Sequence, residues 1–156
     1  MKKAIINSRL FSANQMIGAV IVIENGYISS VGNEIPTGVE LIDLCGKNIA
    51  PGFIDIQING GEQLYFSEHP TEESINDIYQ SSLQYGTTEV LPCLISSSHE
   101  NILEGIEAIK NYRAKYNNGV LGMHLEEPFI NPKNGGQWPA RHVNLTLNGR
   151  NLIYTW

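Results

Sequence analysis

The sequence predicts an α/β protein in which a β-rich segment is followed by alternating strands and helices. Over residues 51–126 the pattern reads strand, helix, strand, helix, strand, an order typical of parallel strands joined by right-handed crossovers. Over residues 1–50 short β-branched runs are separated by turn residues. The pattern alone leaves two architectures open, an open doubly wound sheet and the start of a (β/α)8 barrel.

The first 50 residues are predicted to form a small β domain. Its expected strands occupy residues 4–6, 19–24, 27–31 and 39–44. Asn25 and Gly26 separate two of these runs, and both residue types tolerate the positive φ of a type I′ hairpin turn. Residues 45–48 are expected to form the turn that follows the last strand.

Capping residues mark where the two predicted helices begin. The expected elements are a strand over 53–59, a helix over 71–85, a strand over 87–91, a helix from 98 and a strand over 120–125. Thr71 and Ser98 precede the helices and can accept hydrogen bonds from their first N–H groups. Leu83 belongs to the apolar stripe that predicts the buried face of the first helix, and Pro92 is expected at the end of the second strand.

The composition excludes several classes of partner. The chain has 156 residues and a formal net charge of −6, with only ten Lys and Arg. Nucleic acid and anionic membranes repel an acidic protein, so neither is an expected partner. No GxGxxG or GxxxxGKS/T motif follows a predicted strand, so no nucleotide site is expected.

Cysteine usage and the apolar pattern indicate a cytoplasmic protein. Cys45 and Cys93 are far apart and neither belongs to a CxxC motif, so two free thiols in a reducing compartment are expected. The apolar residues near the N-terminus are too interrupted for a signal peptide. No apolar run approaches the ~20 residues of a membrane helix.

Two sets of polar residues are candidates for chemistry. Asp55, Gln57 and Asn59 alternate along the first strand of the α/β region, so they are expected to share one face. His124 and Glu126 repeat this spacing at the end of the third strand, where α/β enzymes place their sites. Both side chains suit a divalent metal. Two plainer readings stay open, namely polar residues at a strand end and a His–Glu pair bonded to each other.

Three stretches resemble segments of one enzyme family. Residues 50–61 (APGFIDIQINGG) are similar to the segment that opens the barrel of amidohydrolases, with Gln57 and Asn59 where many members carry His-x-His. Residues 122–132 (GMHLEEPFINP) resemble the Gly-x-His-Leu-Glu-Gly-Pro-Phe motif of N-acetylglucosamine-6-phosphate deacetylases. Residues 86–95 (GTTEVLPCLI) resemble the second barrel strand of that family. Their order and spacing also match.

The resemblance implies a fold, a domain division and a reaction. The fold is the N-terminal part of a TIM-type (β/α)8 metal-dependent hydrolase barrel preceded by a small β-sandwich domain. Residues 1–50 are the small β domain, and residues 51–156 are about the first three β/α units of an incomplete barrel. The reaction is hydrolysis of a small amino-sugar phosphate, N-acetylglucosamine 6-phosphate, to glucosamine 6-phosphate and acetate.

The resemblance also implies the site residues. Glu126 takes the position of the family's protein carboxylate ligand to a divalent metal ion, zinc or similar, in the complete enzyme. Neutral amides replace the His-x-His pair and are poor metal ligands, so one metal ion is expected in place of two. The expected substrate-binding residues are Gln57, Asn59, His124, Gln137 and Trp138.

The chain also departs from the family pattern. Glu127 stands where the motif has a glycine after the metal ligand. Residues 134–139 (NGGQWP) replace a Lys-x-Gly-Ala-His-Pro segment, so Trp138 stands at a histidine position and Gln137 at a substrate-contact position. These departures bear on substrate binding.

The family's catalytic aspartate, two metal-binding histidines and most phosphate contacts are expected beyond residue 156. A full barrel needs roughly 250 residues, so residues 1–156 are expected to be an inactive fragment, with a family-like homodimer only for a complete chain. The alternative is a non-catalytic product of a decayed gene, or a binding module that retains the first barrel units. A dihydroorotase-like amidohydrolase is disfavoured because His-x-His is missing.

Overall fold

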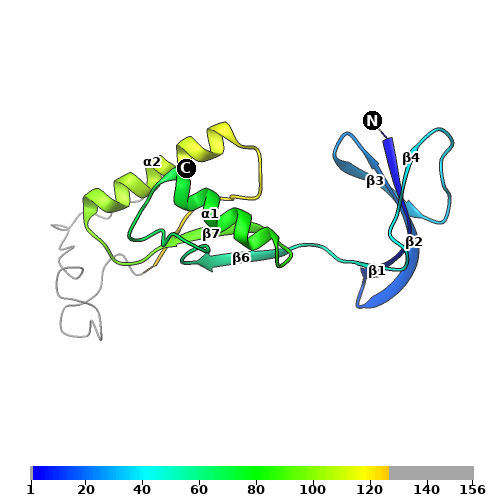
Figure 1. Ribbon diagram of the computed structural model, residues 1–156, viewed down its shortest axis with the longest axis horizontal. Coiled ribbons are helices and arrows are strands. Elements are labelled where there is room, and N and C mark those ends of the chain that lie inside the picture. Colours follow the sequence, from blue (N-terminus) through cyan, green and yellow to red (C-terminus); the bar gives the residue numbers. More distant parts are fainter. Residues whose placement is uncertain (1, 127–156) are drawn as a thin grey trace. The chain divides into compact units, whose positions relative to one another are not determined.

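The computed structural model describes residues 2–126, and the chain divides into two compact units between Pro51 and Gly52 (Figure 1). The first unit contains only strands, whereas the second alternates strands and helices. Among the described residues, none of the helices has the length and apolar character needed to cross a membrane.

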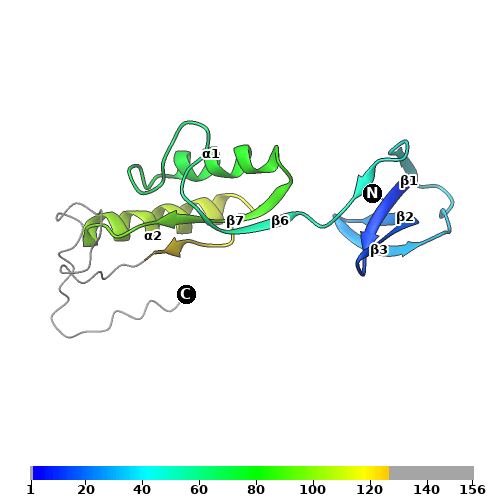
Figure 2. The ribbon, with the colours of Figure 1, turned by 90° about the horizontal axis from the view of Figure 1, so that it is seen from below.

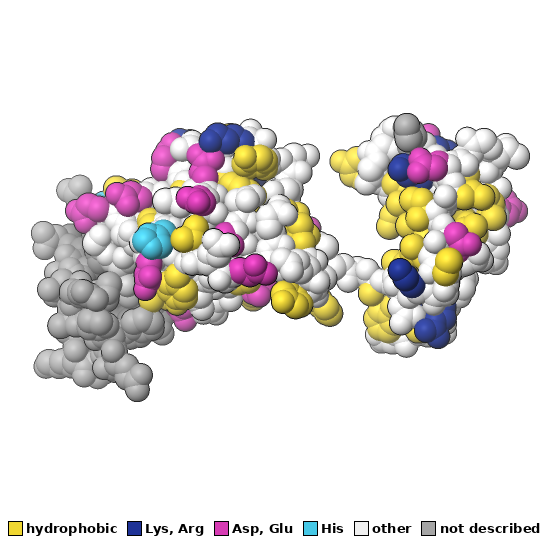
Figure 3. Space-filling model, viewed as in Figure 1, with side chains coloured by type: hydrophobic (Ala, Val, Ile, Leu, Met, Phe, Trp, Pro, Cys, Tyr) yellow, Lys and Arg dark blue, Asp and Glu magenta, His cyan; other side chains and the backbone are white. Residues whose placement is uncertain are grey.

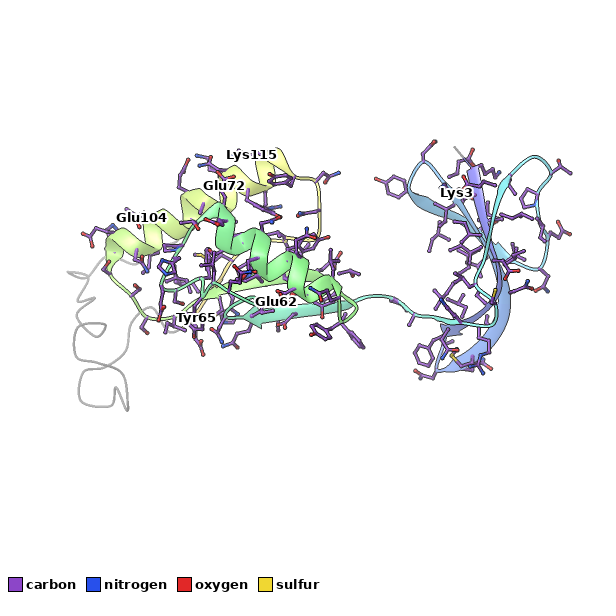
Figure 4. The ribbon with its side chains drawn as sticks, in the orientation of Figure 1. Lys3, Glu62, Tyr65, Glu72, Glu104 and Lys115 are labelled. Carbon is purple, nitrogen blue, oxygen red and sulfur yellow. The ribbon has the colours of Figure 1, made fainter. Side chains whose placement is uncertain are left out.

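The first unit forms a five-stranded mixed sheet. Its strands are β1 (Lys2–Ser12), β2 (Gln15–Glu24), β3 (Tyr27–Gly32), β4 (Glu40–Asp43) and β5 (Asn48–Ile49). The order is β3-β2-β1-β4, with β5 also paired to β1; β1–β2 and β2–β3 are antiparallel, and β1 runs parallel to β4 and β5. An ion pair of 3.2 Å between Lys3 and Glu40 joins β1 to β4 (Figure 4).

Two tight turns with positive φ connect the first three strands. Asn25 and Gly26 have φ of 54° and 84° between β2 and β3, so the predicted hairpin is confirmed. Ala13 and Asn14 have φ of 48° and 63° between β1 and β2, and the sequence did not predict this hairpin. Alanine gives no signal for such a turn, because its Cβ disfavours the left-handed region.

Hydrophobic side chains remain exposed on the first unit (Figure 3). Tyr27 and Ile28 of β3 are 80% and 66% exposed. By contrast, Ala4, Ile21 and Val22 of β1 and β2 are buried. The buried apolar surface of this unit therefore lies under its two long central strands.

The second unit contains a three-stranded parallel sheet of order β6-β7-β8. Its elements are β6 (Phe53–Ile58), α1 (Glu72–Leu83), β7 (Thr87–Leu94), α2 (His99–Lys115) and β8 (His124–Leu125). The predicted order of strands and helices is confirmed. The third strand is shorter than predicted, because Val120 makes only an isolated bridge to Val90 before pairing resumes at His124.

The predicted helix caps are confirmed. The Thr71 hydroxyl accepts from the Ser74 N–H at 3.3 Å, and the Ser98 hydroxyl accepts from the Asn101 N–H at 3.1 Å. Each cap satisfies an N–H that has no partner inside its helix. The helices therefore begin where their polar caps lie.

Two local predictions in this unit are wrong. Leu83 is 39% exposed, and Ile78, together with Ile75, supplies the buried apolar side chains of α1. β7 does not end at Pro92 but continues to Leu94. Pro92 has no N–H to donate to a neighbouring strand. The strand tolerates this because its register with β6 is irregular near Pro92. Its pairing with β8 begins only at the next residue, Cys93.

One face of the β6–β8 sheet packs against α1 and α2 (Figure 2). The core between them consists of buried residues from every layer: Phe66, Ile75, Ile78, Val90, Leu94, Ile102, Ala108, Ile109, Tyr112 and Val120. An ion pair of 2.7 Å between Lys115 and Glu72 joins α2 to the start of α1 (Figure 4). No described element covers the other face, where Ile54 is 57% exposed.

We expect Gly119→Ala to destabilise the second unit, since its backbone lies directly against β7. The Gly119 carbonyl accepts from the Val90 N–H at 2.8 Å, and an added Cβ would collide with the Thr88 carbonyl oxygen. Such overpacking should lower the free energy of unfolding by about 2 to 3 kcal/mol in urea denaturation. Gly122→Ala is the matched control, because its Cβ would meet only the Leu91 side chain at 3.5 Å. Equal stability of the two variants would contradict the packing described here.

Candidate active site

The carboxyl ends of β7 and β8 bring two predicted site residues to one face of the sheet. Cys93 pairs with His124 and Leu94 pairs with Leu125. Since Leu94 lies in the core beneath the helices, the alternation of side chains turns Cys93 and His124 to the opposite face. Glu126 follows β8 on that same face, and its N–H donates to the Leu94 carbonyl at 2.9 Å.

A β-bulge in β6 changes which of its polar residues reach this face. Asp55 pairs with Val90 and Ile58 pairs with Pro92, so three steps on β6 match two on β7. The prediction that Asp55 shares a face with Gln57 and Asn59 is therefore wrong. Its carboxylate instead accepts from the Gln57 N–H at 3.0 Å.

Cys93 joins the polar residues of the three strand ends. Its thiol donates to Oε2 of Glu126 at 3.4 Å. Burial, followed by the hydrogen bond and the charge of the Glu126 carboxylate, raises the pKa of Cys93 to about 12. The sulfur is therefore a protonated donor at neutral pH.

Sequence reasoning did not select Cys93 as a site residue. An isolated, unpaired cysteine is most often a small core residue. The available signal was its position, because Cys93 lies near the carboxyl end of a parallel strand, where α/β proteins place their sites. It is fully buried, yet its sulfur contacts polar groups.

The imidazole of His124 has a defined tautomer. Its Nδ1 lies 2.9 Å from the Ile56 carbonyl oxygen. A carbonyl oxygen can only accept, so Nδ1 must carry the hydrogen. In the neutral ring Nε2 then has a free lone pair and can accept a hydrogen bond. The His124–Glu126 hydrogen bond left open by the sequence is not among the contacts of the described residues; the partner of His124 is the backbone of β6.

The segment between β6 and α1 forms a fixed rim beside these residues. Phe66 anchors it in the core, and the Asp77 carboxylate accepts from the N–H groups of Gln63 and Leu64 at 3.0 and 2.9 Å. The Ser67 hydroxyl donates to the Cys93 carbonyl at 3.3 Å. The rim is thus bonded both to helix α1 and to the strand end that carries Cys93.

Tyr65 lies on this rim and is influenced electrostatically by the site (Figure 4). Burial raises the pKa of its phenol, and Cys93, Glu126 and Glu68 raise it further. Tyr65 therefore stays protonated at neutral pH and can donate a hydrogen bond from its hydroxyl.

Asn59 contributes an unused acceptor. Its Oδ1 is buried and has no hydrogen-bond partner within residues 2–126. An unpaired buried carbonyl costs about 1 to 3 kcal/mol, so a donor from outside this part of the chain would be favourable there. Within the same range no group of three His, Cys, Asp or Glu side chains could hold a metal ion. Glu127, Gln137 and Trp138 lie outside the described residues.

The chain is similar to known sugar-phosphate deacetylases. It is 32% identical over 139 residues to N-acetylglucosamine-6-phosphate deacetylase of Haemophilus influenzae, a match that covers 87% of this chain and 36% of the relative. It is 31% identical over 111 residues to N-acetylgalactosamine-6-phosphate deacetylase of a Shewanella species, covering 71% of this chain and 28% of the relative. No protein-family model matches the sequence.

A solved structure agrees with these sequence matches. N-acetylglucosamine-6-phosphate deacetylase from Pasteurella multocida superimposes with a TM-score of 0.83 at 27% identity, covering 92% of this chain and 38% of that chain. This chain spans about a third of the length of the curated relatives that it matches. Its mixed α/β fold is shared with part of this deacetylase and with part of a solved D-hydantoinase, which superimposes with a TM-score of 0.51 at 23% identity. The chain therefore matches the N-terminal portion of the N-acetylglucosamine-6-phosphate deacetylase family.

Proposed function

We propose that this chain supplies the first strands of a metal-dependent deacetylase that hydrolyses N-acetylglucosamine 6-phosphate to glucosamine 6-phosphate and acetate. The observation that carries the proposal is the position of Glu126. It follows β8 on the same face of the sheet as Cys93 and accepts a hydrogen bond from that thiol. A carboxylate at the carboxyl end of a parallel strand is placed as α/β hydrolases place their ligands.

Glu126 is the residue that would hold a divalent metal ion such as zinc. Its carboxylate suits a metal, whereas Gln57 and Asn59 are neutral amides, so the set fits one metal ion and requires further ligands from outside residues 2–126. A bound metal ion polarises a carbonyl group and lowers the pKa of water toward ~7, which amide hydrolysis at neutral pH requires.

The other polar residues of this face would bind and orient the substrate. His124 offers Nε2 as an acceptor for a sugar hydroxyl, since its Nδ1–H is already bonded to the Ile56 carbonyl. The unpaired Oδ1 of Asn59 would accept from a hydroxyl or amide N–H of the substrate. A neutral tyrosine, Tyr65, provides a donor at the rim. Gln137 and Trp138 stay proposed contacts outside the described residues.

The galactosamine epimer is a second candidate substrate. The match to the Shewanella N-acetylgalactosamine-6-phosphate deacetylase favours including it. The two sugars differ only in the orientation of one hydroxyl group, so a hydrogen bond to that hydroxyl would separate them. Activity assays should therefore use both phosphorylated sugars side by side.

We expect residues 1–156 alone to release no acetate, because residues 2–126 contain no group of three possible metal ligands and catalytic metal sites usually have three protein ligands. The positive test is a chimera in which this chain replaces the matching N-terminal part of the Haemophilus influenzae relative. It should release acetate with added Zn²⁺, and Glu126→Gln should lower kcat/KM by at least about 100-fold. Glu104→Gln, on the exposed face of α2, is the matched control and should leave kcat/KM unchanged.

Three outcomes would contradict parts of this proposal. Acetate release by residues 1–156 that depends on Glu126 would contradict the expected inactivity of this chain alone. A folded, metal-loaded chimera that stays active as Glu126→Gln would contradict the ligand role. A folded chimera without activity on either sugar would favour the non-catalytic alternative.

The His124 tautomer can be checked without substrate. Long-range ¹H–¹⁵N NMR of residues 1–156 above the imidazole pKa should find His124 protonated on Nδ1, because the Ile56 carbonyl accepts from that atom at 2.9 Å. His99, at the start of α2, serves as the internal comparison. A neutral His124 protonated on Nε2 would contradict the proposed substrate-facing lone pair.

A further inference from the structure

We propose that Cys93 is a positioning residue for Glu126: its thiol donates a hydrogen bond to Oε2 and holds the carboxylate in one orientation at the strand ends. The inference rests on the proposed function of Glu126 as a metal ligand. It adds a residue whose role is to orient that ligand from the neighbouring strand.

The sulfur of Cys93 is held in place from several sides. Cys93 lies on the central strand β7, is fully buried, and pairs with His124 of β8. Its carbonyl accepts from the Ser67 hydroxyl at 3.3 Å, and the same hydroxyl accepts from the Ile95 N–H at 3.0 Å. The backbone of Cys93 is therefore fixed by the pairing of β7 with β8 and by the hydrogen bonds of Ser67.

The thiol hydrogen bond has one direction. Cys93 is the donor, and the Glu126 carboxylate accepts from it at 3.4 Å. The thiol hydrogen therefore lies between Sγ and Oε2. This bond connects the central strand β7 to the residue that follows β8.

This hydrogen bond leaves Glu126 able to bind a metal ion. Within residues 2–126, the Cys93 thiol is the side-chain partner found for Glu126, and it uses one lone pair of Oε2. The carboxylate keeps acceptor lone pairs on both oxygens for a metal ion. Partners that hydrogen-bond a metal ligand fix its orientation, and their loss typically weakens metal binding or activity 10-fold to 100-fold.

The direct test is the infrared S–H stretching band, which lies in a window free of other protein vibrations. Residues 1–156 with Cys45→Ser retain Cys93 as their single thiol. We expect one S–H band at lower frequency than that of an exposed thiol, because donation to a carboxylate weakens the S–H bond. Glu126→Gln should shift the band to higher frequency, whereas Glu104→Gln should leave it in place.

A second readout follows the carboxylate itself. In the Cys45→Ser background, the difference spectrum between Cys93→Ala and its parent should contain one shifted carboxylate stretch. Cys93→Ser should restore the parental band, because a hydroxyl also donates. A purely structural role would not distinguish serine from alanine in this band, provided circular dichroism shows both variants folded.

The proposal is overturned by an S–H band that is absent or insensitive to Glu126→Gln, or by identical carboxylate bands in the serine and alanine variants. Neither readout uses metal or substrate. Failure here would therefore leave the deacetylase proposal standing, and failure of the chimera to hydrolyse sugar phosphates would leave this hydrogen bond standing.

Discussion

The register of three parallel strands is the constraint on which the candidate site depends. Cys93 pairs with His124, and Leu94 pairs with Leu125. Because Leu94 and Leu125 face the core, their neighbours Cys93, His124 and Glu126 face the other side of the sheet. One step of slip in a strand would exchange its two faces, sending Glu126 toward the helices and the apolar Leu125 toward the site. The helices therefore determine the polar face indirectly, by requiring Val90 and Leu94 on their own side.

The burial of Cys93 also determines its chemistry. Cys93 is removed from solvent, so its thiol stays protonated and donates to Glu126. The rim that bonds to its backbone through Ser67 is held by Phe66 in the core and by Asp77 of α1. The protonation state of Cys93 and its hydrogen bond to Glu126 thus both follow from the packing around the thiol. Within residues 2–126, the buried Oδ1 of Asn59 still lacks a hydrogen-bond donor.

Much of the fold could be predicted from the sequence because its signals are local. Helical caps at Thr71 and Ser98 and the Asn25-Gly26 turn each depend on a few neighbouring residues, and all three are confirmed. The bulge that turns Asp55 away depends on pairing between two strands, and no local pattern reports it. The Ala13-Asn14 turn has only one residue type that marks positive φ, because alanine disfavours the left-handed region.

The candidate site was only partly predictable for a related reason. Glu126 and His124 were selected as candidates because their residue types and strand-end position suggest chemistry. Cys93 was not, because its contribution comes from burial beside a carboxylate, and burial is a property of the folded chain. A sequence pattern identifies a charged side chain such as Glu126 more readily than the neutral side chain that orients it.

The face on which Cys93 lies can be measured directly by NMR on residues 1–156. The account predicts nuclear Overhauser effects from the Cys93 Hβ protons to the Gln57 side-chain amide and to the Glu126 Hγ protons. Effects from Cys93 Hβ to buried helix residues such as Ile78 or Ile109, with none to Gln57 or Glu126, would place the thiol on the opposite face and contradict it.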